Sequence, residues 1–390
     1  MSRRSHVALL GSLLGTASLL LPWLNVRSTR LTAGIGVGFF GIADTPLAAA
    51  VVALWAVALV ASMEFAGGRR AVLLGIVGTA LLPLSLLVAG IGSAALLNSA
   101  SALSRASLAG GVWMSLLAVY LLLHTAQEGL RERVQLRRLL IFCGPVLVVA
   151  LAACGSFDRL SLVVEFAGNE QRFFQELTRH VALTLGSVGI GASIAVPLGI
   201  AAARNGRARR PIFLISNTIE TVPSLALFGL IIAPLSALSY AYPALRELGI
   251  RGVGATPALI ALVLYSLLPI VHNTYAGMRQ VPKATLDAGL GMGMSRRQLS
   301  WRVEYPLALP LIGEGIRTAS VQSVGNTAVA ALIGAGGLGH FIFQGLGQAA
   351  PDLILLGALP VIALALAIDV LMRMLIRMIT PRGLGLEAGQ

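Results

Sequence analysis

Long apolar segments, separated by short polar stretches, run along almost the whole chain. A membrane-crossing helix needs about 20 predominantly apolar residues, because each residue adds about 1.5 Å along the helix axis and the hydrocarbon layer is about 30 Å thick. The predicted spans are residues 7–25, 45–64, 71–91, 107–125, 138–154, 181–203, 211–234, 255–274, 308–332 and 351–372. The pattern therefore predicts an all-α integral membrane protein of about ten transmembrane helices.

The composition places the chain in the same class. Hydrophobic residues occupy 56% of the 390 positions and charged residues 12%, whereas roughly a quarter of an ordinary soluble domain is charged. This balance excludes a soluble enzyme, because one globular core could not bury so much apolar surface. The two cysteines, Cys143 and Cys154, lack the spacing of a disulfide framework or a zinc site. The loops contain no nucleophile with a nearby base, no paired carboxylates and no metal cluster, so we expect neither a catalytic nor a metal site.

The net charge of +13 is carried by arginines in short clusters between the apolar segments. Such clusters are typical of topology signals and differ from the basic face that binds nucleic acid. With an even number of spans and both termini in the cytoplasm, most clusters fall on the cytoplasmic side, as the positive-inside rule requires. Arg3 and Arg4 also fit a twin-arginine export signal, but no A-x-A cleavage site precedes Trp23. We therefore expect the first span to be retained.

A change in composition near residue 155 divides the chain into two parts. Residues 1–155 are rich in Leu and Ala and predict an accessory region of about five transmembrane helices. Residues 156–180 mix Phe and Leu with charged residues, which predicts an amphipathic helix on the external membrane surface. Residues 181–380 predict a second group of about five transmembrane helices, followed by a cytoplasmic tail over residues 381–390. The second group carries nearly all the polar residues at membrane depth.

The longest hydrophilic stretch is the loop of residues 275–306, on the predicted cytoplasmic side. Gly291 and Gly293 favour a sharp turn in it, and Ser295 is a suitable N-cap for a second short helix. We therefore expect a helix, a turn and a helix that project into the cytoplasm. The loop is too short to hold a soluble domain, and it suits a docking element for another protein.

Two nucleotide-binding patterns are excluded by their context. Gly334, Gly336 and Gly339 have the G-x-G-x-x-G spacing of a dinucleotide fingerprint, but they follow a membrane span and no βαβ unit surrounds them. We interpret this segment as a flexible turn. A P-loop needs Gly-Lys followed by Ser or Thr, and the only lysine, Lys283, follows a proline. If ATP drives this protein, a separate subunit binds it.

The loop carries the residues of a family motif. Residues 287–289 read Asp-Ala-Gly, Gly293 follows after three residues, and residues 303–306 read Val-Glu-Tyr-Pro after nine more. This resembles the E-A-A-x3-G-x9-I-x-L-P loop of ABC-importer permeases, with Asp for Glu, Gly for the second Ala, Val for Ile and Tyr for Leu. The glycine is expected to loosen the helix by up to about 1 kcal/mol.

Three further segments resemble a particular branch of these permeases. Residues 217–227, 265–275 and 316–339 are similar to the permeases of osmoprotectant importers for glycine betaine, choline or carnitine, and the similarity covers about residues 178–376. The additional amino-terminal spans resemble those of Yeh-type glycine betaine permeases. The resemblance implies a type I ABC-importer permease core in the C-terminal half, which would import glycine betaine or a related quaternary ammonium osmoprotectant.

The resemblance also implies partners and a docking site. A cytoplasmic ABC ATPase dimer would bind ATP and Mg²⁺, and an external or periplasmic substrate-binding protein would deliver the solute. A second permease subunit, identical or homologous, would complete the path through the bacterial cytoplasmic (inner) membrane. This chain itself would hold no cofactor, bind no nucleic acid and not be an enzyme. The residues expected to couple the loop to the ATPase are Ala284, Asp287, Ala288, Gly289, Gly293, Met294, Ser295, Arg296, Arg297 and Pro306.

Polar side chains inside the predicted spans are costly and are candidates for the translocation path. These candidates are Glu220, Ser224, His272, Asn273, Arg317 and Asn326. Glu220 would lie close to the middle of the membrane, where its carboxylate would favour a quaternary ammonium group, or it would be a carboxylic acid hydrogen-bonded between helices. Arg317 would neutralise Glu314 or contact substrate, and Asp369 would pair with Arg373 four residues on.

The sequence fits two other classes of function less well than an importer. An ion-gradient-driven secondary transporter of a small solute would require inverted repeats around a midplane ion site, and the parts before and after residue 155 show no convincing repeat. It would also leave the loop of residues 275–306 without a role. A membrane-embedded enzyme would require a cluster of titratable groups at one membrane depth, which Glu220 alone does not supply.

Overall fold

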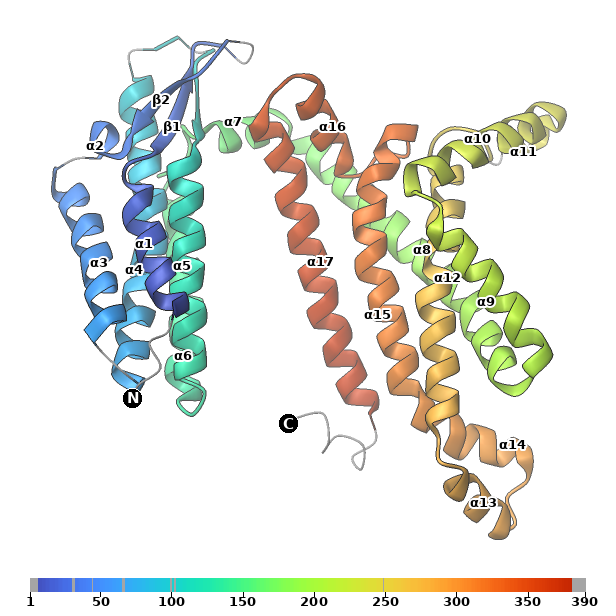
Figure 1. Ribbon diagram of the computed structural model, residues 1–390. Helices are drawn as coiled ribbons and strands as arrows, with labels where there is room; N and C mark the ends of the chain where they lie inside the picture. The colour runs from blue at the N-terminus through green and yellow to red at the C-terminus, as the bar shows by residue number, and fades with distance from the viewer. Residues whose placement is uncertain are drawn as a thin grey trace. The chain divides into compact units, whose positions relative to one another are not determined.

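The computed structural model describes residues 6–29, 32–43, 45–64, 67–98, 100–101, 103–247 and 249–380. Arg3, Arg4 and the predicted cytoplasmic tail of residues 381–390 lie outside the described residues. The chain forms two compact units (Figure 1). Unit 1 extends to Gly168 and includes Gly347–Asp352, and unit 2 contains Asn169–Leu346 and the chain from Leu353 onward. The division lies inside the stretch for which the sequence predicts an external amphipathic segment.

Unit 1 combines apolar helices with a small antiparallel sheet. Its helices are α1 (His6–Ser18), α2 (Phe39–Ile42), α3 (Thr45–Glu64), α4 (Gly67–Leu97), α5 (Gly110–Gly129), α6 (Val134–Ala153) and α7 (Ser161–Gly168). The strands are β1 (Pro22–Arg27), β2 (Ile35–Gly38) and β3 (Arg105–Leu108), in the order β2–β1–β3. Leu24 in the central strand pairs with Val37 on one side and with Leu108 on the other. This sheet is not among the elements predicted from the sequence.

The predicted first span, residues 7–25, is wrong in its second half. Helix α1 has 13 residues and ends at Ser18, and the chain then enters β1 at Pro22. Proline cannot donate the hydrogen bond that would continue the helix. The fully buried Trp23 fixes the junction, because its indole Nε1 donates to the Ser18 carbonyl oxygen at 2.8 Å. An apolar run therefore does not require one helix when its end can pair in a sheet.

Bulky and small side chains fit together inside unit 1. Trp55 of α3 is fully buried, and Gly15 of α1 accommodates it, since a Cβ atom on Gly15 would lie 2.0 Å from the indole ring. Ser85 of α4 and Ser115 of α5 share a buried hydrogen bond of 3.0 Å between their hydroxyl oxygens. Small and hydroxyl-bearing residues at such contacts are typical of helices that pack inside a membrane.

Unit 2 contains the remaining helices and two short turns of other helical types. They are α8 (Glu170–Arg204), α9 (Gly206–Thr221), α10 (Ser224–Ala241), α11 (Pro243–Glu247), α12 (Ala255–Gln280), α13 (Lys283–Gly291), α14 (Arg296–Leu299), a π-helical turn (Ser300–Glu304), α15 (Tyr305–Ala330), a 3-10 turn (Ala331–Ile333), α16 (Gly339–Gly347) and α17 (Pro351–Ile379). Among the described residues, eight helices are long and apolar enough to cross a membrane: α3, α4, α5, α6, α8, α10, α12 and α17. The predicted helical membrane class is confirmed.

The predicted span of residues 211–234 is interrupted in the structure. Helix α9 ends at Thr221, and α10 begins at Ser224. Between them Val222 and Pro223 are extended, because a residue before proline is driven out of the helical region and proline cannot donate to the preceding turn. Glu220 therefore does not lie in the middle of one continuous span, as the sequence analysis expected. It is the penultimate residue of α9.

The predicted surface segment of residues 156–180 is also divided differently. Its first part contains α7, which ends at Gly168. Its second part is the beginning of α8, which continues without a break from Glu170 through the predicted span of residues 181–203 to Arg204. No glycine or proline lies between Glu170 and Leu185 to end the helix. The prediction of a separate amphipathic helix before this span is therefore wrong.

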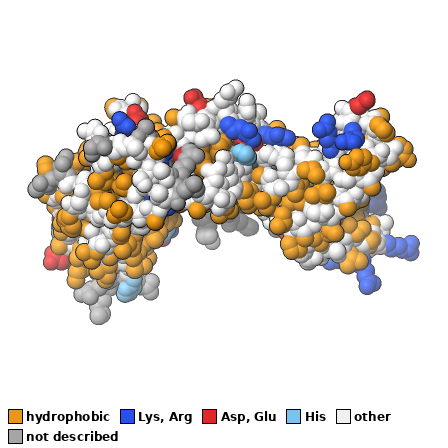
Figure 2. Space-filling model, turned by 90° about the horizontal axis from the view of Figure 1, so that it is seen from above, with side chains coloured by type: hydrophobic (Ala, Val, Ile, Leu, Met, Phe, Trp, Pro, Cys, Tyr) orange, Lys and Arg blue, Asp and Glu red, His pale blue; other side chains and the backbone are white. Residues whose placement is uncertain are grey.

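Large apolar side chains cover much of the visible surface, with basic side chains gathered in small groups (Figure 2). On α6 the exposed apolar side chains are Leu139, Phe142, Val146, Leu147 and Val149. On α17 they include Leu359, Ile362, Leu366, Val370 and Leu371. A water-soluble protein rarely leaves such continuous apolar faces uncovered. These faces suit lipid contact.

Helices α8, α12 and α15 form the packed centre of unit 2, and glycines bring them close together. A Cβ atom added to Gly199 of α8 would lie 2.5 Å from Thr274 Cβ of α12. A Cβ atom on Gly277 of α12 would lie 2.9 Å from the Ala308 carbonyl oxygen of α15. Backbones can approach this closely only where the intervening side chain is absent. The three helices are therefore held by contacts that a larger residue would force apart.

We expect Gly199→Leu to separate α8 from α12 and to destabilise unit 2 by about 1–3 kcal/mol, the usual cost of overpacking a close contact. Gly189→Leu is the matched control on the same helix, since nothing lies within 4 Å of a Cβ atom there. Thermal unfolding of the detergent-solubilised protein should show a lower Tm for the Gly199 variant only. Equal Tm values for the two variants would contradict the packing described for α8 and α12.

Candidate functional site

The loop between α12 and α15 forms the helix, turn and helix that the sequence predicts. Helix α13 ends at Gly291, and the turn that follows has Gly293 in the left-handed region, with φ of 83°. The backbone N–H groups of Met292 and Met294 donate to the carbonyl oxygens of Ala288 and Gly289 at 3.0 and 3.1 Å. The turn therefore satisfies the carbonyl groups at the end of α13, and only glycine adopts the required φ without strain.

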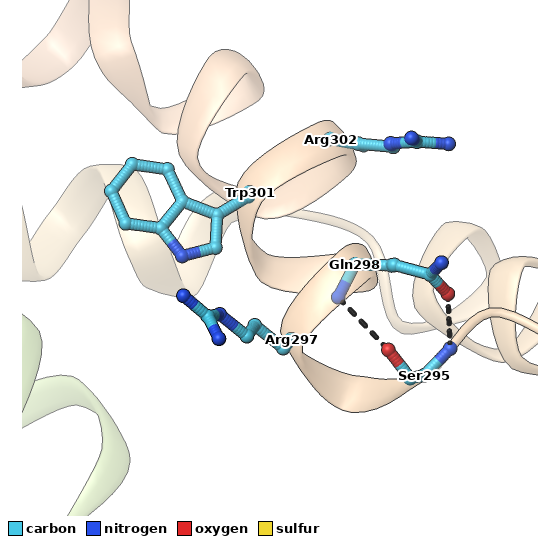
Figure 3. Close-up of a pocket in the computed structure, with 5 residues that line it drawn as sticks. All are labelled: Ser295, Arg297, Gln298, Trp301 and Arg302. Atoms are coloured by element: carbon cyan, nitrogen blue, oxygen red, sulfur yellow. Dashed lines mark hydrogen bonds between the residues drawn. The ribbon is translucent and has the colours of Figure 1, made fainter.

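The second helix begins at the predicted N-cap. The Ser295 hydroxyl oxygen accepts from the Gln298 backbone N–H at 3.3 Å, and the Ser295 backbone N–H donates to Gln298 Oε1 at 2.8 Å (Figure 3). This reciprocal capping box fixes the start of α14. A shallow hollow on this helix and the π-helical turn is lined by Ser295, Arg297, Gln298, Trp301 and Arg302.

Gly289 makes a close contact within the loop, in addition to the loosening of α13 expected from the sequence. It was expected to loosen α13, because it stands where the resembled motif has alanine. In the structure it is buried, and a Cβ atom on it would lie 2.5 Å from Leu299 Cδ1 of α14. The glycine therefore lets the two short helices pack directly on each other. The departure from the motif is matched by a close contact within the same loop.

Most of the proposed coupling residues lie on the surface of this loop. The exposed ones are Ala284, Asp287, Ala288, Gly293, Ser295, Arg296 and Arg297. Met294 and Pro306 are half-buried, and Gly289 is buried. Exposure of short side chains along α13 leaves room for another backbone to approach. The arrangement is that of a folded projection with a free face, as a docking element requires.

An ion pair at the base of the loop joins it to α8. Arg204 Nη2 lies 2.8 Å from Glu304 Oε2 and donates to the Ser300 hydroxyl oxygen at 2.9 Å. The Arg204 guanidinium also lies over the Tyr305 ring, 5.4 Å from its centroid. Tyr305 stands where the resembled motif has leucine, so the substitution supplies an aromatic face for the cation. No pattern in the sequence predicts this contact, because Arg204 and Glu304 are far apart in the chain.

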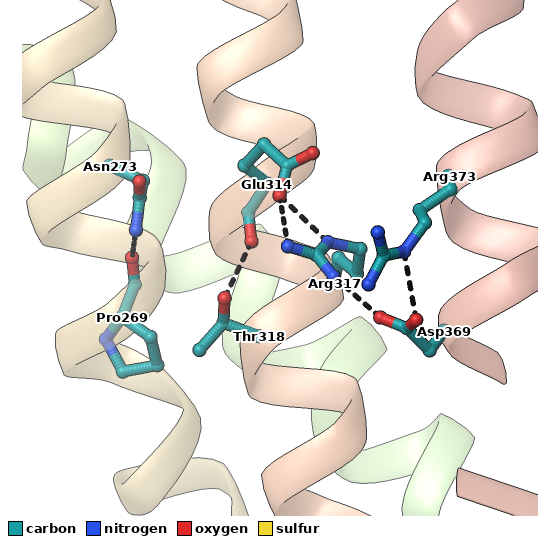
Figure 4. A network of polar contacts seen from close by, with 7 residues as sticks. All are labelled: Pro269, Asn273, Glu314, Arg317, Thr318, Asp369 and Arg373. Atoms are coloured by element: carbon teal, nitrogen blue, oxygen red, sulfur yellow. Dashed lines mark hydrogen bonds and ion pairs between the residues drawn. The ribbon is translucent and has the colours of Figure 1, made fainter. Parts of the chain in front are cut away.

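A second group of ion pairs connects α15 with α17 (Figure 4). Arg317 lies 2.6 Å from Glu314 Oε2, and Asp369 Oδ2 lies 2.8 Å from Arg373 Nε, so both pairs predicted from helical spacing are confirmed. In addition, Arg317 Nη1 lies 2.5 Å from Asp369 Oδ1. Spacing along one helix could not reveal this interhelical bond. Arg317 is thus occupied by two carboxylates in this structure.

The other candidates for the translocation path are not brought into one cluster. Glu220 is exposed at the end of α9, and Ser224 begins α10 on the other side of the break. His272 is exposed, with its ring centroid 5.9 Å from that of Phe213. Asn273 Nδ2 donates to the Pro269 carbonyl oxygen of its own helix at 2.8 Å (Figure 4). Asn326 is half-buried on α15.

The glycine segment after α15, interpreted from the sequence as a flexible turn, is hydrogen-bonded to α8 in the structure. The Gly337 backbone N–H donates to Glu176 Oε2 at 2.6 Å, and the Leu338 backbone N–H donates to His180 Nδ1 at 3.2 Å. Gly336 and Gly337 have positive φ values of 76° and 90°. Glu176 and His180 were missed because the sequence analysis assigned them to a separate surface helix.

The apolar helices and the folded loop between α12 and α15 define a multi-span membrane protein. Residues 195–382 match the family of binding-protein-dependent transport system inner membrane components. Residues 3–163 match the N-terminal domain of the ABC transporter permease YehY. The chain belongs to the family of permease components of binding-protein-dependent ABC transport systems. The resemblance found in the loop motif is confirmed.

Two curated relatives match more than half of the chain. The glycine betaine/carnitine/choline transport system permease protein OpuCB of Bacillus subtilis is 40% identical over 205 residues, which are 53% of this chain and 87% of the relative. The osmoprotectant import permease protein OsmW of Salmonella typhimurium is 39% identical over 229 residues, 58% of this chain and 99% of the relative. Among solved structures, an inward-facing MetNI methionine ABC transporter is similar at 20% identity with a TM-score of 0.47, over 54% of this chain and 96% of that chain.

We expect Gly289→Leu to push α14 away from α13, because its side chain would occupy the position of Leu299. Local opening of residues 283–299 should become about tenfold more frequent, and hydrogen exchange followed by mass spectrometry measures it. Gly291→Leu is the control, since a Cβ atom there meets nothing within 4 Å. If the two variants exchange equally fast, the Gly289–Leu299 contact does not hold the loop together.

Proposed function

We propose that this permease subunit imports a quaternary ammonium osmoprotectant, glycine betaine or a related compound, and is driven by a separate ABC ATPase. The observation that carries the proposal is the folded projection of α13 and α14, with its exposed face and its ion-paired base. Family membership and relatives named for glycine betaine, carnitine, choline and osmoprotectant transport support the solute class.

The proposed orientation places the loop and both termini, including residues 381–390, in the cytoplasm of a bacterial inner membrane. An ATPase dimer, holding ATP and Mg²⁺, docks on α13 and α14. When the ATPase closes, the loop moves, and Arg204 and Glu304 transmit that movement to α8 and α15 because the ion pair joins these helices at the base of the loop. An external substrate-binding protein delivers the solute to the opposite side.

A second permease subunit, identical or homologous, completes the translocation path. Helices α9 and α15 expose polar side chains, Asn217, Thr218, Glu220 and Thr221 on the first and Thr318 and Gln322 on the second. The threonine hydroxyls donate to carbonyl oxygens of their own helices, whereas exposed amide and carboxyl groups on a membrane helix are stable only against water or another polar surface. These faces therefore suit a path between two subunits. A quaternary ammonium group has no hydrogen-bond donor, so a carboxylate such as Glu220 favours it through charge.

Replacing residues 284–299 with a Gly/Ser linker should abolish co-purification of an ATPase subunit with the membrane-extracted protein, because the docking helices would be gone. Replacing the exposed residues 131–133 of unit 1 in the same way is the control, and it should leave recovery unchanged. An ATPase recovered equally well with both replacements would contradict docking on this loop. Recovery of no ATPase with the folded wild-type protein would contradict the importer class itself.

Glu220→Gln should lower the uptake of radiolabelled glycine betaine about tenfold, which corresponds to ~1.4 kcal/mol, because the carboxylate charge is lost while the side-chain shape is kept. Glu247→Gln, at another exposed carboxylate, is the control and should transport normally. Co-purification of the ATPase should be unchanged in both variants. Normal uptake by the Glu220 variant would exclude a role of this carboxylate in the path.

A further inference from the structure

One face of α8 carries a continuous row of buried polar side chains. Glu176, His180, Thr184 and Ser187 follow one another at intervals of four, four and three residues, so they share one helical face. Glu176 is 5% exposed, and the other three are fully buried. Buried polar groups are costly unless they are hydrogen-bonded, so each needs a partner on the neighbouring helix.

Three members of this row bind α15. The hydroxyl oxygens of Thr184 and Thr327 are 3.1 Å apart, and those of Ser187 and Ser323 are 2.9 Å apart. His180 Nε2 lies 3.1 Å from the Val324 carbonyl oxygen. These three hydrogen bonds join α8 to α15 along this part of their contact.

The row continues into the glycine loop, residues 334–339. Glu176 Oε2 accepts from the Gly337 backbone N–H, and His180 Nδ1 accepts from that of Leu338. Since His180 Nδ1 accepts and Nε2 faces a carbonyl oxygen, the proton belongs on Nε2, and a neutral imidazole satisfies both bonds. Arg172 Nε orients the Glu176 carboxylate at 2.9 Å.

The glycines of this loop allow it to fold back on the helices. A Cβ atom on Gly336 would lie 2.7 Å from Arg179 Cδ, and one on Gly339 would lie 1.8 Å from the Ala328 carbonyl oxygen. Leu338 is fully buried, and its carbonyl oxygen lies 2.6 Å from where a Cβ atom on Gly357 of α17 would be. The loop therefore brings α8, α15, α16 and α17 together.

The opposite end of α8 carries the Arg204–Glu304 ion pair, next to the α13–α14 loop. Helix α8 has 35 residues, so about 50 Å separates its ends. Near its end at Arg204, α8 is bound to Glu304, which directly precedes α15. Toward its other end, it is bound to α15 and to the glycine loop that follows α15. A displacement of the α13–α14 loop can then reach the glycine loop through two helices that move as one body.

We propose that Glu176 and His180 are positioning residues for transport: they lock the glycine loop to α8, so that the α13–α14 loop and the opposite face of unit 2 move together. This inference rests on the proposed function. The lock is the pair of hydrogen bonds from the glycine loop to Glu176 and His180, and through it a loaded binding protein on one side stimulates the ATPase on the other. Neither residue contacts the solute in this scheme.

The test uses the full transporter, reconstituted with its co-purifying ATPase and binding protein, with glycine betaine as solute. His180→Gln keeps a donor toward Val324 but removes the acceptor for the Leu338 N–H group, whereas His180→Asn places an acceptor near the position of Nδ1. We expect His180→Gln to reduce binding-protein stimulation of ATP hydrolysis about tenfold, with basal hydrolysis within twofold of wild type. His180→Asn should keep most of the stimulation that the wild-type complex shows. Gln175→Ala, on the exposed side of α8, is the control.

Hydrogen exchange of residues 334–340 gives a second measurement that needs no activity. The His180→Gln variant should exchange at least tenfold faster there than the Gln175→Ala variant, and His180→Asn should be close to wild type.

Wild-type stimulation in His180→Gln, or an equal loss of basal and stimulated hydrolysis in both His180 variants, would overturn the proposal. If the wild-type complex shows no stimulation by the loaded binding protein, the proposed function fails. The lock is then judged by exchange alone, and equal rates in all variants would refute it.

Discussion

The close contact of α8, α12 and α15 is the constraint on which unit 2 depends. Between helices that face lipid there is little hydrophobic gain in association, so contact must come from tight packing and from paired polar groups. Here glycines at 191, 199 and 277 let backbones approach, and hydroxyl pairs between α8 and α15 are hydrogen-bonded to each other. The same helices carry the α13–α14 loop at one end and the glycine loop at the other.

Two residues that differ from the importer loop motif, Gly289 and Tyr305, each make a contact that holds the loop in place. Gly289 in place of alanine makes room for Leu299, and Tyr305 in place of leucine gives Arg204 an aromatic face beside its ion pair with Glu304. One substitution tightens the loop internally, and the other strengthens its attachment to α8. Both contacts hold the loop together and attach it to α8, as the proposed docking of an ATPase requires.

Sequence patterns predicted what depends on neighbours in the chain. Apolar runs revealed the membrane class, turn residues revealed the loop and the Ser295 cap, and helical spacing revealed the Glu314–Arg317 pair. Contacts between distant segments were not accessible: Asp369 with Arg317, Glu304 with Arg204, and the sheet that takes the end of the first apolar run. The largest error had one cause. Treating residues up to 180 as a separate surface helix hid the polar face of α8 and made the glycine loop look unattached.

The proposed function requires that ATP, and not an ion gradient, drives glycine betaine through this permease. The most direct measurement is uptake of radiolabelled glycine betaine into proteoliposomes that contain the purified transporter, with binding protein outside and ATP and Mg²⁺ enclosed. We expect accumulation that requires hydrolysable ATP and persists when ionophores collapse the Na⁺ and H⁺ gradients. Accumulation without ATP that follows an imposed Na⁺ or H⁺ gradient would contradict it and would assign the chain to secondary transport.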